Sequence, residues 1–248
     1  MKSLYESILS STKSGSYALI EDWCKKHLRS MKTGNDEHGW MINSKMRVTN
    51  WTNGRSVNTI QIPSEYGLDI PDYIKFEGNE DGNFMIGQAL NHMKPEQLPE
   101  CCEVLYISGY TKTIPSFKMR CMSGLYINDY SQLLTKIEPI EIEMHSTQNG
   151  NKKPIINLSN TKIDIESLKN IHVTGEVNRL NIQKTPAAET IKKFIQKNRP
   201  DKLKRGECPE CEQYFTELFK SLPGLRYIEL SDRSHIEWNE RMQKWYLF

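Results

Sequence analysis

Pairs of aliphatic residues separated by one other residue recur along most of the chain. They lie in six short segments: Val104 to Ser108, Gly124 to Asn128, Pro139 to Glu143, Ile155 to Ser159, Arg179 to Gln183 and Tyr227 to Ser231. Successive side chains of a strand point to opposite faces, so each pair lies on one face. The pattern therefore predicts a series of β-strands, each with one buried face.

The spacing of these pairs indicates a repeated architecture. The pairs are Leu105/Ile107, Leu125/Ile127, Ile140/Ile142, Ile156/Leu158, Leu180/Ile182 and Ile228/Leu230. An earlier pair of the same kind is Phe84/Ile86. From Ile86 to Leu158 the second members of successive pairs are 21, 20, 15 and 16 residues apart, near or below the ~20–29 residues of a leucine-rich repeat. The six segments lack the Asn or Cys that such a repeat places three residues after its second leucine. We therefore predict an α/β solenoid, an irregular leucine-rich-repeat-like ladder of parallel strands.

A helical pattern precedes the ladder. Apolar residues three and four apart predict helix over residues 1–30, interrupted at Ser14-Gly15-Ser16. We expect residues 1–38 to form a helical N-terminal cap on a repeat domain of residues 39–248, because the first repeat of such an array needs its open core covered. A period-two pattern on both sides of Asn53-Gly54 favours a hairpin at that turn.

A second helical region interrupts the ladder near the C-terminus. Thr185 followed by Pro186 is typical of a helix start, with Thr as the N-cap and Pro at the first helical position. Another apolar stripe with helical spacing begins at about Pro209. These features predict a two-helix insertion over residues 185–222.

Several short motifs in the first half of the chain resemble a known group of proteins. The motifs are Ile20-Glu21-Asp22-Trp23, Pro71-Asp72-Tyr73-Ile74-Lys75-Phe76, Gly82-Asn83-Phe84 and Leu98-Pro99-Glu100. In this order, over about residues 1–130, they resemble the uncharacterised leucine-rich-repeat-like proteins of tailed phages of gut bacteria. The resemblance implies a leucine-rich-repeat-like phage protein in the cytoplasm of the host cell, and it implies no activity.

The composition indicates which binding partners and which cellular compartment to expect. Lys plus Arg number 33 and Asp plus Glu number 31, so a net charge of +2 favours neither nucleic acid nor an anionic membrane. The six cysteines follow no apolar signal stretch, which indicates a reducing, cytoplasmic compartment and mostly free thiols. The apolar runs are far shorter than the ~20 residues of a membrane-spanning helix, so we expect no membrane partner.

One motif has the form of a chemical site. Cys208-Pro209-Glu210-Cys211 is compatible with half of a zinc site, but a second ligand pair is missing from the sequence. A redox role requires the first cysteine between a strand and a helix, and a basic segment, Lys202 to Gly206, precedes it. We favour a structural role and expect no metal, with the metal and redox alternatives left open.

Basic residues gather in the insertion. Residues 184–205 contain eight Lys or Arg against Glu189 and Asp201, a density that can meet phosphates. The stretch has Phe194 as its aromatic residue, and Phe194 lies on the apolar face with Ile191 and Ile195. We favour a solvated helix face, and nucleic-acid binding by this basic insertion is the alternative function.

No catalytic set is evident. The six histidines are scattered, and none has a nucleophile or carboxylate at a spacing that indicates a triad. Glu141 and Glu143 are two residues apart and so lie on one face of a strand, which is weak evidence for acid–base catalysis. We therefore expect a non-enzymatic protein without a cofactor.

The residues between and just after the aliphatic pairs remain for binding. If the pairs face inward, these residues form the concave face. The predicted binding residues are Tyr106, Tyr126, Asn128, Glu141, Glu143, Asn157 and Glu229. Tyrosines are common binding anchors, although tyrosine also favours strands for its own sake. We predict a protein-interaction module that binds a host or phage protein through this concave face.

Overall fold

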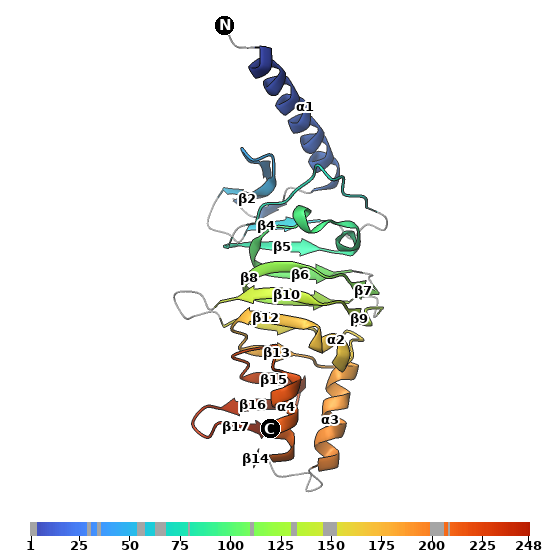
Figure 1. Cartoon of the computed structure of the whole chain (residues 1–248), viewed down its shortest axis with the longest axis vertical. Helices are drawn as coiled ribbons and strands as arrows, with labels where there is room; N and C mark the ends of the chain where they lie inside the picture. Colours follow the sequence, from blue (N-terminus) through green and yellow to red (C-terminus); the bar gives the residue numbers. More distant parts are fainter. Residues whose placement is uncertain are drawn as a thin grey trace.

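The structure, a computed structural model, describes residues 4–28, 31–33, 36–53, 58–62, 68–78, 80–109, 112–129, 133–145, 153–198, 206–207 and 209–248. Its elements are stacked along one long axis (Figure 1). Helix α1 (Leu4–His27) stands at one end, and the C-terminal strands lie at the other. The strands between them run roughly across this axis (Figure 1).

Twelve strands form the main sheet. They are β4 (Asn58–Gln61), β5 (Gly82–Ile86), β6 (Cys101–Ser108), β8 (Lys118–Asn128), β10 (Ile140–Met144), β11 (Ile155–Asn157), β12 (Ile171–Gly175), β13 (Arg179–Asn181), β14 (Gly206–Glu207), β15 (Tyr227–Ser231), β16 (Ser234–Asn239) and β17 (Lys244–Leu247). The order along the sheet is β14-β17-β16-β15-β13-β11-β8-β6-β5-β4, with β10 and β12 as a branch. Pairing is parallel from β4 to β15 and antiparallel from β15 to β14.

Smaller elements surround this sheet. They are the three-stranded sheet of β1 (Met31–Thr33), β2 (Asp36–Ile42) and β3 (Val48–Asn53), the pair of β7 (Thr113–Ile114) and β9 (Lys136–Ile137), the 3-10 helices η1 (Gln88–His92) and η2 (Pro95–Gln97), and the α-helices α2 (Ile165–Lys169), α3 (Pro186–Asn198) and α4 (Pro209–Leu218). Together with the main sheet they enclose one continuous apolar core among the described residues.

The parallel strands pair so that their aliphatic residues form continuous buried rows. Leu105 lies opposite both Phe84 and Leu125, and Leu180 lies opposite Ile156 and Ile228. Each of these side chains is at most 1 % exposed. Each of the six predicted segments contains a strand, so this prediction is confirmed. Burial of the aliphatic rows fixes both the register of the strands and the face that points inward.

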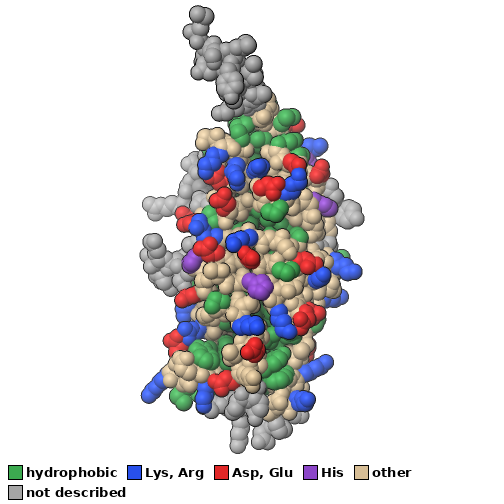
Figure 2. All heavy atoms as spheres, in the orientation of Figure 1, with side chains coloured by type: hydrophobic (Ala, Val, Ile, Leu, Met, Phe, Trp, Pro, Cys, Tyr) green, Lys and Arg blue, Asp and Glu red, His purple; other side chains and the backbone are tan. Residues whose placement is uncertain are grey.

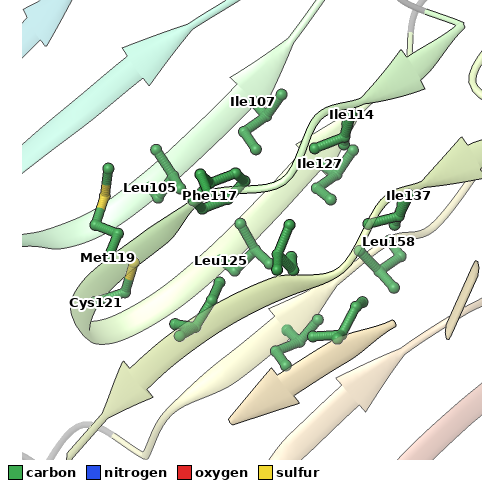
Figure 3. Close-up of a cluster of buried hydrophobic side chains, with 14 of the residues drawn as sticks. Leu105, Ile107, Ile114, Phe117, Met119, Cys121, Leu125, Ile127, Ile137 and Leu158 are labelled. Carbon is green, nitrogen blue, oxygen red and sulfur yellow. The ribbon is translucent and has the colours of Figure 1, made fainter. Parts of the chain in front are cut away.

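Strand β8 is the branch point of the sheet. Its first half, Lys118 to Arg120, pairs with β10, whereas its second half, Gly124 to Tyr126, pairs with β11. Between the halves the pairing with β6 shifts register, as a β-bulge does, and a bulge bends the strand that contains it. Side chains from both halves, such as Met119 and Leu125, still join one buried cluster (Figure 3).

The predicted leucine-rich-repeat-like solenoid is wrong. The chain forms a mixed α/β fold with four α-helices and a twelve-stranded, mostly parallel sheet among its described residues. The spacings of 15 and 16 residues treated β8, β10 and β11 as successive repeats. In the structure β10 belongs to the branch, and β11 follows β8 directly in the main path. The antiparallel strands β15, β16 and β17 also differ from a repeat of one strand and one crossover.

The predicted C-terminal helices are present. Helices α3 and α4 fall within residues 185–222, and the backbone N–H of Ala188 donates to Thr185 Oγ1 at 3.1 Å. This bond confirms Thr185 as the N-cap, because such a side chain satisfies an N–H that the helix leaves unpaired. Phe194 of α3 stacks on Tyr214 of α4, with ring centroids 3.9 Å apart.

At the N-terminal end one detail differs from the prediction, and another falls outside the described residues. Helix α1 continues through Ser14-Gly15-Ser16, because a glycine costs a helix interior only about 1 kcal/mol and does not end it. The hairpin joins β2 to β3 through residues 43–47, where Asn43 Oδ1 accepts hydrogen bonds from the N–H groups of Lys45 and Arg47. An Asn side chain that bonds the following backbone defines a turn. The hairpin predicted at Asn53-Gly54 falls on residues 54–57, which lie outside the described residues.

Candidate functional site

Two of the predicted binding residues form a stacked pair on the outer face of the main sheet. Tyr106 of β6 and Tyr126 of β8 are opposite each other in the parallel register. Their neighbours along each strand are buried, so the two rings project from the other face, and both are half-buried. The ring centroids are 5.2 Å apart with an interplanar angle of 25°, within the range of favourable aromatic stacking.

The bulge in β8 shapes the floor beside these rings. Ser123 Oγ donates to the backbone oxygen of Glu103 at 3.3 Å and ties the bulge to β6. Gly124 follows, and a Cβ atom on it would meet Cε2 of Tyr126 at 2.8 Å. The glycine therefore lets the ring of Tyr126 approach the strand more closely than any other residue would allow.

A pocket of about 370 Å³ opens beside the stacked rings. It is lined by Asn83 of β5, Glu103 and Tyr106 of β6, Ser123 and Tyr126 of β8, and Lys153 before β11, together with Val104 and Ile155. We call it the tyrosine pocket. Its volume is at the lower end of the ~300–1,000 Å³ that ligand sites occupy.

One polar atom of a residue that lines the tyrosine pocket lacks a partner. The Oδ1 atom of Asn83 is buried and has no hydrogen-bond partner among the described residues. A buried acceptor without a donor costs about 1–3 kcal/mol, and such groups in native proteins require an explanation. A ligand that brings a donor into the pocket would supply the missing bond.

Three other predicted binding residues lie on the same side of the sheet, and two of them, Asn157 and Glu229, are engaged within the chain. Asn157 pairs with Tyr126 in the register, and its Oδ1 accepts from both the N–H and the hydroxyl of Ser159. Asn128, opposite Ser108, is half-buried at the end of β8. The side chain of Glu229 is 11 % exposed and forms an ion pair with Arg179.

Glu141 and Glu143 are not in the column with the tyrosines, so the predicted single column is wrong for them. Both belong to β10, where Glu141 lies opposite Lys118 and His172. Glu141 forms an exposed ion pair with Lys118 at 3.0 Å. Glu143 Oε1 is 2.7 Å from His145 Nε2, and this hydrogen bond lowers the pKa of Glu143. The branch at β8 separates these acids from the tyrosine pocket.

A larger groove of about 520 Å³ lies between α2, β12 and α4. Lys169, His172 and Tyr214 line it, and burial raises the pKa of Tyr214. Lys169 is paired with Glu166 at 2.8 Å. The described residues leave no buried polar side-chain atom without a partner in this groove, so the tyrosine pocket carries the stronger sign of a ligand.

The cysteines divide into two groups. Cys24, Cys101, Cys102 and Cys121 are free, as predicted for most of the thiols, whereas Cys211 is disulfide-bonded and fully buried. Burial, with a smaller effect of Glu21, raises the pKa of Cys24 to about 12. Cys208 lies outside the described residues. Within the described ranges no group of three or more His, Cys, Asp or Glu side chains is placed to hold a metal ion.

The basic insertion is described only in part. Lys184, Lys192, Lys193 and Lys197 lie in the described ranges, while Arg199, Lys202, Lys204 and Arg205 lie outside them. Lys192 is paired with Glu189 at 2.8 Å, and the ring of Phe194 is stacked on Tyr214. On the face shown in Figure 2, acidic and basic side chains of the described residues are interspersed along the long axis. Nucleic-acid binding stays a prediction.

Comparison with known proteins adds no relative. No family model, no curated protein and no solved structure matches this chain. None of the described helices is both long enough and apolar enough to cross a membrane.

The sequence pattern did not indicate Asn83, Glu103, Ser123 or Lys153 as site residues. Asn83, Glu103 and Ser123 lie at different positions along three strands, and Lys153 precedes a fourth. A bulge that the alternation does not encode brings Glu103 and Ser123 together. A glycine two residues before an outward-facing strand tyrosine, as in Gly124 and Tyr126, was the available signal.

Proposed function

We propose that this chain is a non-enzymatic interaction module that binds a segment of another protein at the tyrosine pocket. The observation that carries the proposal is the stacked pair of Tyr106 and Tyr126 beside a buried acceptor, Asn83 Oδ1, that lacks a partner. Tyrosines of this kind provide large contact area at little cost in side-chain entropy, and they are enriched among binding hot spots.

The geometry of the surface also suits a protein segment. Tyr106 and Tyr126 already restrain each other by stacking, so less rotamer freedom is lost on binding. The pocket, at the lower end of the range of ligand sites, is large enough for a side chain. By its resemblance to phage proteins, the partner is a host or phage protein.

The test is a selection of binding peptides. A library of displayed random peptides is selected on the wild-type protein, and the enriched peptides are measured against a Tyr106→Ala/Tyr126→Ala variant. We expect a loss of affinity of about thirtyfold or more, as for two hot-spot residues. A Tyr73→Ala variant, which removes an exposed tyrosine elsewhere on the surface, should leave the affinity unchanged.

Two results would refute the proposal. Peptides that bind the double variant as tightly as the wild type use another surface. A selection that enriches no peptide from several libraries gives no support to a peptide-binding pocket. Thermal unfolding of both variants shows whether the fold is retained, because these rings are only half-buried and their removal should not unfold the chain.

A further inference from the structure

The outer face of the sheet already binds one guanidinium group, supplied by the chain itself. On β13, Cζ of Arg179 lies 5.2 Å from the ring centroid of Tyr227, and Arg179 forms an ion pair with Glu229. Both partners belong to the adjacent strand β15, with Tyr227 directly opposite Arg179 in the register. An aromatic face and a carboxylate together are favourable for arginine, whose planar group stacks and donates at the same time.

The row of positions that contains Arg179 continues to the tyrosine pocket. Arg179 lies opposite Ile155, and Ile155 lies opposite Gly124. At Gly124 the row has no side chain, and the ring of Tyr126 packs over this glycine. The pocket beside the two rings is also lined by Glu103 and by Asn83, whose Oδ1 lacks a partner. Aromatic rings and an acidic residue, the residue types around Arg179, thus recur at a pocket where the chain supplies no arginine.

We propose that the tyrosine pocket receives an arginine side chain of the protein partner. This assignment rests on the proposed function, and it adds the chemistry of the bound side chain. The guanidinium stacks on the exposed tyrosine surface and donates a hydrogen bond to Asn83 Oδ1, while the negative charge of Glu103 favours a cation. Lys153 also lines the pocket, but its side chain is exposed, so water screens its charge.

Arginine fits better than lysine for a geometric reason. An ammonium group is a compact, strongly hydrated charge, whereas a guanidinium is planar, more weakly hydrated and able to donate at its edge while its face lies on a ring. The pocket is lined by two tyrosine rings and by Asn83, whose amide oxygen lacks a partner. It therefore distinguishes the two cations by shape and hydration, since their charge is the same.

The experiment uses three capped tripeptides, Ala-Arg-Ala, Ala-Lys-Ala and Ala-citrulline-Ala, as probes. Their binding is followed by the ring NMR signals of Tyr106 and Tyr126 in the full chain. We expect the arginine probe to bind about threefold to tenfold more tightly than the lysine probe. Citrulline keeps the planar donors without the charge, and its probe should bind about tenfold more weakly than the arginine probe.

Two variants at one position test the acceptor. Asn83→Leu removes it and should weaken binding of the arginine probe about tenfold, while the citrulline probe loses less. Asn83→Asp replaces the amide by a carboxylate and should strengthen arginine binding about threefold. The second variant keeps the test meaningful if the leucine variant does not fold.

The outcomes separate this inference from the function on which it rests. Equal affinity for the arginine and citrulline probes, or no change in either Asn83 variant, overturns the arginine assignment. Selected peptides that depend on Tyr106 and Tyr126 but bind without a basic residue overturn it as well, and they leave the proposed function intact. Failure of the peptide selection itself overturns the proposed function.

Discussion

Two tyrosine clusters on the same face of the main sheet differ in what covers them. The ring of Tyr227 lies between Arg179, at 5.2 Å from its centroid, and His235, at 4.5 Å, and His235 stacks in turn on Phe248. The rings of Tyr106 and Tyr126 stack on each other beside an open pocket. The first cluster, which we call the closed cluster, is completed within the chain. We infer that the second, which we call the open cluster, is completed by a partner.

The difference teaches that sheet position alone does not determine the role of a strand tyrosine. Both clusters occupy the outer positions of parallel strands over the same kind of aliphatic row. What separates them is what lies beside the rings: Arg179 is directly opposite Tyr227, whereas Gly124, in the same row, is covered by the ring of Tyr126 next to the open pocket. The closed cluster should therefore contribute to stability, and the open cluster to binding.

The largest effect is expected below both clusters, where they share one core. Leu125→Ala beneath the tyrosine pocket and Leu180→Ala beneath the closed cluster each remove a fully buried side chain. Each should lower the free energy of unfolding by about 2–5 kcal/mol, measured by urea denaturation. A cost well below this range for one of them would show that the two regions do not rest on equally packed cores.

Removing the arginine of the closed cluster should have a smaller effect on stability. Arg179→Ala leaves the nearly buried Glu229 without its ion-pair partner, which costs about 1–2 kcal/mol. The affinity for a peptide bound at the tyrosine pocket should be unchanged. If Arg179→Ala left stability intact and weakened the peptide instead, the assignment of roles to the two clusters would be reversed.

Gly124→Ala should sharpen the comparison at the open cluster. The added Cβ displaces the ring of Tyr126, since their distance would be 2.8 Å, so peptide affinity should fall about threefold while overpacking costs about 1 kcal/mol. Gly15→Ala in α1 is the matched control, because a Cβ there meets nothing within 4 Å. Titration calorimetry that found both alanine variants equal in affinity to the wild type would contradict the role of Gly124.

The smallest effect concerns the thiols near the open cluster. The sulfur atoms of Cys102 and Cys121 are 3.9 Å apart, and the hydrogen bond between them, together with burial, raises the pKa of Cys102. Because the thiolate is the reactive form, alkylation at neutral pH should modify half-exposed Cys101 well before Cys102. Mass spectrometry that found both modified at the same rate would show that the core under the tyrosine pocket opens.

The strands of this fold were predictable from the sequence, but their neighbours were not. Alternation in segments such as Val104 to Ser108 indicates which side chains are buried, and burial then fixes the face. Alternation does not say which strand pairs with which, so β10 was placed in line with β8 instead of in the branch. The N-cap at Thr185 was predictable because capping is a local interaction.

The candidate site was predictable only at its centre. Tyr106 and Tyr126 follow from the strand pattern, since they alternate with buried aliphatic residues. Asn83 and Glu103 do not, because their approach to the rings depends on register between strands and on the bulge at Ser123. The engagement of Glu229 by Arg179 depends on a cross-strand contact that one sequence does not reveal.

A pair of matched tyrosine variants tests the central claim most directly. Tyr126→Ala and Tyr227→Ala remove the same side chain from the open and the closed cluster, and both are measured for affinity to one selected peptide. We predict a loss of about tenfold or more for Tyr126→Ala, and a change within about twofold for Tyr227→Ala together with a lower free energy of unfolding. Equal losses of affinity in the two variants would contradict the claim that only the open cluster binds.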